Sequence, residues 1–145
     1  MRTIADLLKQ AKQIDLHLEI ELSFFDTREE FVALQLDQLK HGERNDGKPI
    51  FNIKTGSDQY SPAYAKKKGK SKPIDLHDTG DFYFGTFADV REEGIYVDSA
   101  DYKSNRLQEN YGEEIFGLAD ERKEPYAEIA VNKLRSNIQK ALNKQ

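Results

Sequence analysis

The first 25 residues change from one hydrophobic pattern to another. After Thr3, a suitable N-cap, apolar side chains recur at helical spacing at Ile4, Leu7, Leu8 and Ala11. Over residues 14–25 apolar and mainly charged residues then alternate one by one. A strand would place these apolar side chains on one face, whereas a helix would be apolar on two sides and need burial on both. The alternation favours a strand over 14–25; the alternative is that the first helix continues into an oligomer interface.

The next segment has clear helix signals at both ends. Thr27 and Glu30 have the spacing of a capping box, and Gly42 follows as a stop signal. The pattern therefore predicts a helix over 28–41. Turn-forming residues dominate 43–60, which predicts a long loop with at most one short strand at 50–53. A connection of that length is either functional or flexible.

A miniature helix is predicted over 61–69. Ser61 suits its N-cap, Pro62 its first position and Gly69 its end, and Tyr64 would anchor it by packing. Lysines occupy its last turn, where the helix dipole favours cations.

The second half of the chain predicts a hairpin and a long helix. Residues 82–90 resemble a strand that pairs with 95–97 across a turn, with Phe82 and Phe84 on one face and a bulge near Gly85. A short helix follows over 103–111, for which Ser104 is a candidate cap, and Pro125 opens a C-terminal helix over 125–143. The expected fold is α+β: one domain over 1–145, with an antiparallel sheet packed by the helices at 28–41 and 125–143.

Composition narrows the function classes. The chain has 145 residues, of which 37% are hydrophobic and 33% charged, which suits one domain with a modest core that self-association would help to stabilise. The absence of cysteine excludes disulfides, thiolate nucleophiles and cysteine-bound metals. No apolar run approaches the roughly 20 residues of a membrane span. The N-terminus carries an acidic residue early and lacks an apolar central region, so it does not resemble a signal peptide. We therefore expect no membrane partner and synthesis in the cytosol.

Candidate catalytic chemistry is sparse. Asp75, His77, Asp78 and Asp81 form one polar cluster worth considering as a metal or hydrolase site. Turn and cap roles explain these residues better, because no second histidine lies nearby. The tripeptide at 78–80 matches that of aspartic proteases but occurs once, and no nucleophile elbow or phosphate loop is present. We expect no enzymatic activity, no cofactor and no metal.

A run of lysines near aromatic residues is the remaining binding signal. It comprises Lys66, Lys67, Lys68, Lys70 and Lys72. Such a run close to aromatic residues is compatible with a nucleic-acid-binding accessory protein. The aromatic residues concentrated in the middle of the chain are Tyr60, Tyr64, Phe82, Tyr83, Phe84, Phe87, Tyr96, Tyr102 and Tyr111. The net charge of −4 argues against this role, and a solvated turn is the simpler interpretation.

Four sequence blocks, in order, resemble the tail-completion and virion-morphogenesis proteins of tailed bacteriophages. Asp46–Pro49 resembles that family's Gly-Lys/Arg-Pro turn, and Ser61–Gly69 its Ser-Pro-x-Tyr-x-x-x-Lys-Gly block. Leu76–Phe82 resembles the Leu-x-x-Thr-Gly-x-Leu block, and Ile115–Leu118 the Pro-Phe-Leu-Gly-Leu block. Tyr111 and Gly112 stand in the place of an aromatic-Gly pair.

The resemblance covers roughly 45–142 and leaves 1–26 unplaced. It implies a non-enzymatic phage or prophage structural protein in head–tail joining or tail completion, assembling with itself, often as a ring, and with portal, neck or tail-tube proteins. Its expected location is the virion, after assembly in the bacterial host cytoplasm. The contact surfaces it implies are the loop 43–60 and the turn and hairpin entry formed by Tyr64, Lys66, Lys67, Lys68, Lys70, Lys72, Thr79, Gly80 and Phe82.

Overall fold

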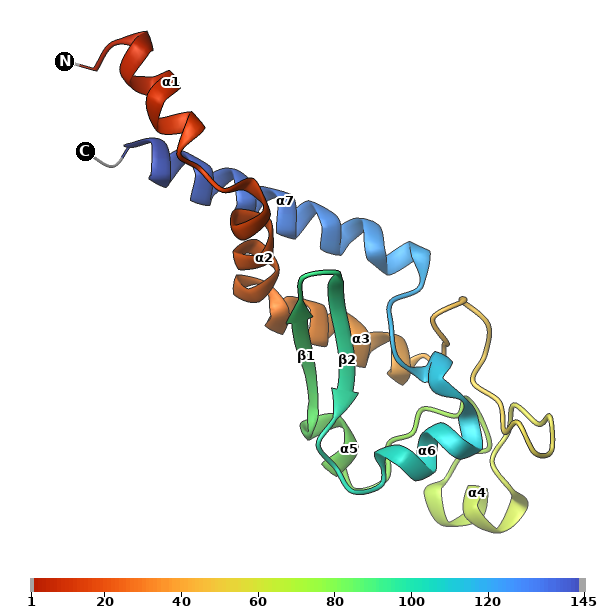
Figure 1. The fold of residues 1–145 in the computed structure, drawn as a ribbon. Coiled ribbons are helices and arrows are strands. Elements are labelled where there is room, and N and C mark those ends of the chain that lie inside the picture. Colours follow the sequence, from red (N-terminus) through yellow and green to blue (C-terminus); the bar gives the residue numbers. More distant parts are fainter. Residues whose placement is uncertain (1, 144–145) are drawn as a thin grey trace.

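The computed structural model describes residues 2–143 and has an α+β fold, as predicted (Figure 1). The strands are β1 (Thr86–Arg91) and β2 (Gly94–Ser99). The helices are α1 (Ile4–Lys12), α2 (Leu16–Asp26), α3 (Arg28–Lys40), α4 (Pro62–Lys68), α5 (Asp81–Phe84), α6 (Ser104–Tyr111), the 3-10 turn η1 (Glu113–Ile115) and α7 (Asp120–Asn143).

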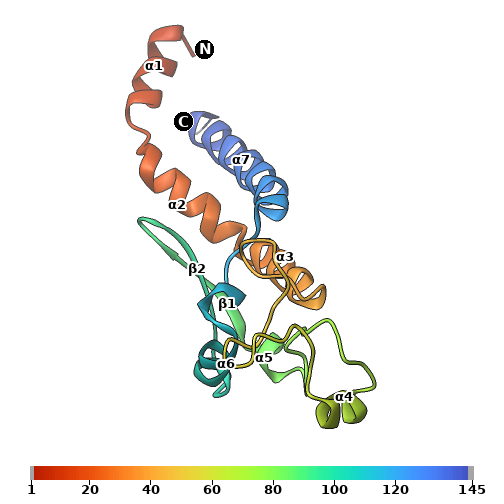
Figure 2. The same cartoon turned by 90° about the vertical axis from the view of Figure 1, so that its right-hand side faces the viewer.

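The antiparallel hairpin lies in the middle of the molecule. Its register pairs Val90 with Ile95 and Arg91 with Gly94, which confirms the predicted turn between the strands. Both views place α1, α2 and α7 at one end, together with the two ends of the chain, and α4, α5 and α6 at the other (Figures 1 and 2). Helix α3 joins the two ends beside β1.

The core has two apolar clusters that α3 connects. One is built on α3, the long loop, α5 with the segment before it, and η1, and it contains Leu39, Ile50, Ile74, Leu76, Phe82, Tyr83 and Ile115. The other joins α3, α7 and the segment before α7 through Phe31, Leu118, Tyr126 and Ala130, and the hairpin packs against it through Ala88, Ile95 and Val97. The helix predicted at 28–41 and the C-terminal helix therefore both pack against the hairpin, as expected.

Two buried glutamines attach the segment before α7 to α3. The Gln35 side-chain amide donates to the Ile115 carbonyl at 3.1 Å, and its oxygen accepts from the Gly117 amide at 2.8 Å. Gln38 makes an equivalent pair of hydrogen bonds with Gly117 and Ala119. The amide side chains thus satisfy backbone groups that no strand or helix pairs.

The strand predicted over 14–25 is wrong: most of this segment is α2. Asp15 caps the helix by accepting from the Leu18 amide at 3.2 Å. One side of α2 is buried at Ser23 and Thr27, while Leu18 and Leu22 on the other side remain exposed. The strand prediction assumed that both apolar sides of a helix would need burial within one chain, and here one side is left uncovered.

The capping box predicted at Thr27 and Glu30 is also absent. The Thr27 hydroxyl instead donates to the Ser23 carbonyl at 2.7 Å and lies 2.9 Å from the Tyr126 hydroxyl. It makes no side-chain cap to α3, because α2 leads directly into α3 at this residue.

The strand predicted over 82–90 begins later than expected. Gly80, with φ of +94°, leads into the helical turn α5, and β1 starts only at Thr86. Phe82 is buried but Phe84 is 94% exposed, so the two do not share a buried face. The pairing of β1 and β2 is continuous, so the irregularity at Gly85 is a helix-to-strand change and not a bulge.

Two helix-start predictions fail, at Ser104 and Pro125, and the short strand allowed for at 50–53 does not form. Within the described residues, 50–53 forms no strand, because Asn52 organises a turn by accepting from the Lys54 amide. The Ser104 hydroxyl bonds the Asp98 carboxylate and does not cap α6. Helix α7 begins at Asp120, and Pro125 lies inside it.

Candidate functional site

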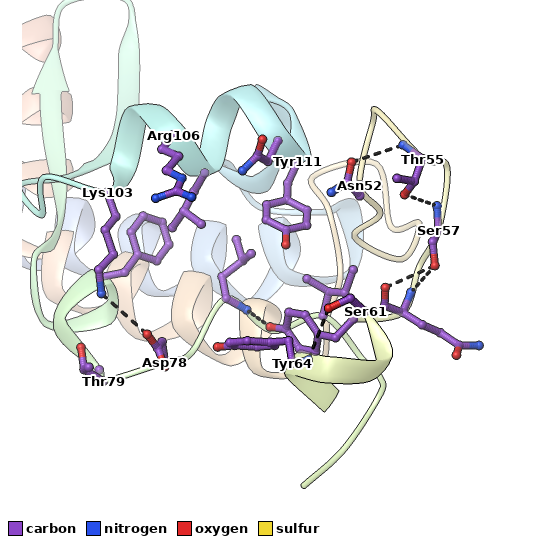
Figure 3. A pocket seen from close by; sticks show the side chains of 18 of the residues that line it. Asn52, Thr55, Ser57, Ser61, Tyr64, Asp78, Thr79, Lys103, Arg106 and Tyr111 are labelled. Carbon is purple, nitrogen blue, oxygen red and sulfur yellow. Dashed lines mark hydrogen bonds and ion pairs between the residues drawn. The ribbon is translucent and has the colours of Figure 1, made fainter. Parts of the chain in front are cut away.

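A groove of about 790 Å³ lies between α4, α6 and the loop that precedes α4 (Figure 3). Four tyrosines line it, namely Tyr60, Tyr64, Tyr102 and Tyr111. Apolar side chains from separate elements also line it, namely Ile74, Leu76, Phe82 and Leu107. Its volume and mixed lining are typical of a binding site.

The groove brings together four of the residues predicted from the sequence. Tyr64, Thr79, Gly80 and Phe82 all line it. The Tyr64 ring packs against Tyr60 with ring centroids 4.8 Å apart, which confirms its anchoring role. The cap signals of α4 are confirmed as well, since Ser61 accepts from the Tyr64 amide and Gly69 ends the helix with φ of +88°.

The cations of the groove are Lys103, the N-cap residue of α6, and Arg106 within α6 (Figure 3). Lys103 lies 3.9 Å from the Asp78 carboxylate across the opening. Arg106 is exposed, and among residues 2–143 no hydrogen bond or ion pair engages its guanidinium. Sequence reasoning missed both residues as site residues, because nothing in the spacing of α6 marks them. The nearby Tyr102 and Tyr111, noted as aromatics, were the available signal.

Asp75 is the polar centre behind the groove. Its carboxylate accepts from the Lys68 ammonium group at 2.6 Å and from that of Lys70 at 2.7 Å. The Tyr60 hydroxyl and the His77 amide also donate to it, each at 3.1 Å. Burial alone would raise the pKa of this carboxyl, but the hydrogen bonds from the two lysines outweigh burial and lower the pKa to about 2.

Two tyrosines hold the backbone around Asp75. The Tyr60 hydroxyl accepts from the amides of Asp75 and Leu76 at 3.2 and 3.1 Å, and the Tyr83 hydroxyl donates to the Asp75 carbonyl. Burial and the neighbouring Asp75 carboxylate raise the pKa of both phenols. Leu76 has a φ of +59°, a strained conformation for a residue with a Cβ, and such strain is common at binding sites. These bonds fix the backbone that forms this side of the groove.

The predicted lysine run is not a single surface. Lys68 and Lys70 bind Asp75 and, with Lys67, line a second hollow of about 450 Å³. Lys66 and Lys72 are exposed and line neither hollow. The ion pairs neutralise part of the positive charge that the nucleic-acid alternative requires.

The four residues considered as a metal site, Asp75, His77, Asp78 and Asp81, do not form one cluster either. Asp75 already binds two ammonium groups, while His77, Asp78 and Asp81 are exposed. The His77 ring packs edge-on against Tyr83 at 5.0 Å between centroids. Within residues 2–143, no group of three or more His, Asp or Glu side chains is arranged to hold a metal ion.

The groove offers aromatic faces, side-chain amides from Asn52 and Asn110, and the cations Lys103 and Arg106. These groups are suited to non-covalent binding of a polypeptide segment, since tyrosine and arginine are enriched in protein interfaces. Across the described residues, no helix has both the length and the apolar character of a membrane span. No family model, curated protein or solved structure matches this chain, so its resemblance to phage proteins rests on the sequence blocks alone.

Proposed function

We propose that this chain is a non-enzymatic structural protein of a phage or prophage that acts in head–tail joining or tail completion. It works by self-assembly and by receiving a segment of a portal, neck or tail-tube protein in the groove between α4 and α6. Its proposed location is the virion, after assembly in the host cytoplasm.

The supporting observation is that separate blocks of the resemblance meet around one groove. Ser61 and Tyr64 come from one block, Thr79 and Phe82 from the next, and Tyr111 from the aromatic-Gly pair. The block at 115–118 lies directly behind them, because Phe116 packs on Phe82 with centroids 5.8 Å apart. Residues that a family would share only to stabilise a core have no reason to converge on an open surface.

The chemistry of the groove favours an extended segment with an acidic side chain. An exposed guanidinium at Arg106 and the ammonium group of Lys103 lie on the α6 side, and Ile74 and Leu107 supply apolar contact. A bidentate pair between a carboxylate and Arg106 would add orientation to the apolar contact. Tyrosines provide contact area at a low cost in conformational entropy.

The test is binding of the purified chain to the portal, neck and tail-tube proteins encoded in the same genome, measured by calorimetry or pull-down. Arg106→Glu is expected to weaken binding by about tenfold or more, since central charged contacts in interfaces commonly contribute at that level. Arg91→Glu makes the same charge change on the hairpin, outside the groove lining, and should leave binding unchanged.

The proposal is wrong if the chain binds none of these proteins, or if both variants weaken binding equally. Gel shift across a range of salt concentrations separates the nucleic-acid alternative, because phosphate contacts give a steep salt dependence.

A further inference from the structure

A carboxylate of the chain itself already engages one of the two cations of the groove. The Asp78 carboxylate lies 3.9 Å from the Lys103 ammonium group, and its side chain is 60% exposed, against 26% for Lys103. Figure 3 shows this carboxylate between Lys103 and the Tyr64 hydroxyl. Asp78 therefore connects the α4 side of the groove to the α6 side at the opening.

The contact between Asp78 and Tyr64 completes this connection. Burial raises the pKa of the Tyr64 phenol, and the negative charge of Asp78 and a hydrogen bond to it raise the pKa further. Tyr64 and Asp78 line both the groove and the second hollow, so they stand at the boundary between the two. The carboxylate thus has a cation on one side and a hydroxyl donor on the other.

The segment that carries Asp78 is short and exposed. Residues 77–79 are all exposed, and they lie between two residues with positive φ, Leu76 at +59° and Gly80 at +94°. Among residues 2–143, no backbone hydrogen bond engages Asp78. Its position over the groove therefore depends mainly on its side-chain contacts, and an exposed segment held in this way opens at a low cost in free energy.

An acidic group that enters the groove competes with Asp78. In the described part of the chain, Arg106 has no ion pair, whereas Lys103 is paired with Asp78. A carboxylate that approaches Lys103 meets the like charge of Asp78, which opposes its binding. An exposed ion pair is weak enough to be displaced, yet it lowers the fraction of chains in which Lys103 is available to a ligand.

We propose that Asp78 is an autoinhibitory latch of the groove. In the free chain it binds Lys103 and Tyr64, and an acidic side chain of the partner segment takes its place when the segment docks. The two cations then differ in role, because Arg106 is open to the partner from the start and Lys103 becomes available only after Asp78 leaves. This inference rests on the proposed function and identifies a residue that limits the affinity of the same groove.

The test measures, by calorimetry, binding of the whole chain to the portal, neck and tail-tube proteins encoded in the same genome. Asp78→Asn is expected to strengthen binding about two- to fivefold, which is the gain from releasing a weak, exposed ion pair. Asp81→Asn is the matched control, because it removes the same charge from an exposed side chain three residues later, outside the groove lining. It should leave the affinity unchanged, and circular dichroism confirms that each variant keeps its helices.

A double-mutant cycle with Lys103→Gln separates a latch from simple charge repulsion. If Asp78 acts by holding Lys103, Asp78→Asn should lose most of its effect on binding once Lys103 is replaced. The latch is contradicted if Asp78→Asn leaves the affinity unchanged or lowers it, if Asp81→Asn strengthens binding as much, or if the full gain persists in the Lys103→Gln background.

The same measurements distinguish failure of the latch from failure of the groove proposal. Binding by the wild-type chain that Asp78→Asn does not strengthen contradicts the latch alone. Absence of binding by both the wild-type chain and Asp78→Asn contradicts the groove proposal and the latch together.

Discussion

The side-chain oxygen of Gln38 accepts a hydrogen bond from the Ala119 backbone amide at 2.7 Å. Gln38 is fully buried, and its side-chain amide donates to the Gly117 carbonyl at 2.8 Å. These two hydrogen bonds connect α3 to the segment just before α7, which is far away in sequence. They fix where the C-terminal helix starts relative to the core, so we expect them to contribute strongly to stability.

Replacing Gln38 with leucine should lower the free energy of unfolding by about 2–4 kcal/mol, because it leaves a backbone amide and a carbonyl buried without partners. Urea denaturation followed by circular dichroism measures the change. Gln139→Leu on the exposed side of α7 is the control and should stay within about 0.5 kcal/mol of the wild type. Equal effects of the two variants would contradict a structural role for Gln38.

The hydrogen bond between Thr27 and Tyr126, at 2.9 Å, should couple α2 to α7. We expect Thr27→Val to cost about 1–2 kcal/mol, because it removes the partner of a buried phenol. In a double-mutant cycle with Tyr126→Phe, the coupling should be on the order of 1 kcal/mol. Glu30→Ala should be nearly neutral, since Glu30 caps no helix here. A large loss of stability in Glu30→Ala would indicate that Glu30 does cap α3, as predicted from the sequence.

Stability should fall in acid partly through Asp75. The pKa of its carboxyl is lowered to about 2 in the folded chain, below the ordinary value of 3.8, because Lys68 and Lys70 outweigh the effect of burial. The carboxylate therefore stabilises the fold fully above about pH 5, and this contribution disappears as the pH falls toward 2. The contribution is roughly 2 kcal/mol.

The measurement compares wild type with Asp75→Asn in urea at several pH values. The difference in unfolding free energy is expected to be largest near pH 7 and to shrink between pH 5 and pH 2. Asp58→Asn, on the exposed loop, should remain close to wild type at pH 7. A difference for Asp75→Asn that is constant with pH would show that its carboxylate charge does not stabilise the fold.

Gly42 should tolerate no side chain. Its φ is +70°, and a Cβ there would lie 2.4 Å from the Pro73 Cβ and 3.1 Å from the Ile74 carbonyl oxygen. We expect Gly42→Ala to cost roughly 3 kcal/mol or more. Gly56→Ala separates the causes, because Gly56 has a similar φ of +73° with nothing within 4 Å of its Cβ position. Gly56→Ala should lower the free energy of unfolding by only about 1 kcal/mol. If both variants lose the same stability, backbone strain explains the whole effect and the contacts with Pro73 and Ile74 do not contribute.

Local signals predicted much of this fold correctly. The Ser61 cap, the Pro62 start and the Gly69 end of α4 all act within a few residues, as do the Gly42 stop and the turn of the hairpin. These features depend on backbone conformation and on hydrogen bonds between near neighbours. Their energies are nearly independent of the rest of the chain, so residue order was sufficient to predict them.

The sequence alone could not predict which surfaces would be covered. Alternation over 14–25 is compatible with a strand or a helix, and contact between α2 and α7 selected the helix. The hydrogen bond between Thr27 and Tyr126 joins residues 99 positions apart, so no local signal could have predicted it.

The groove was decided in the same way. Tyr64, Thr79, Gly80 and Phe82 were identifiable from their sequence blocks, but only the tertiary structure shows that Lys103 and Arg106 line the same groove. The sequence shows Lys68 and Lys70 as part of a basic run. Only the tertiary structure shows that both pair with Asp75. Residue order determined the local conformations of this protein, whereas the tertiary structure determined its contacts, because burial and charge pairing depend on segments that the sequence keeps far apart.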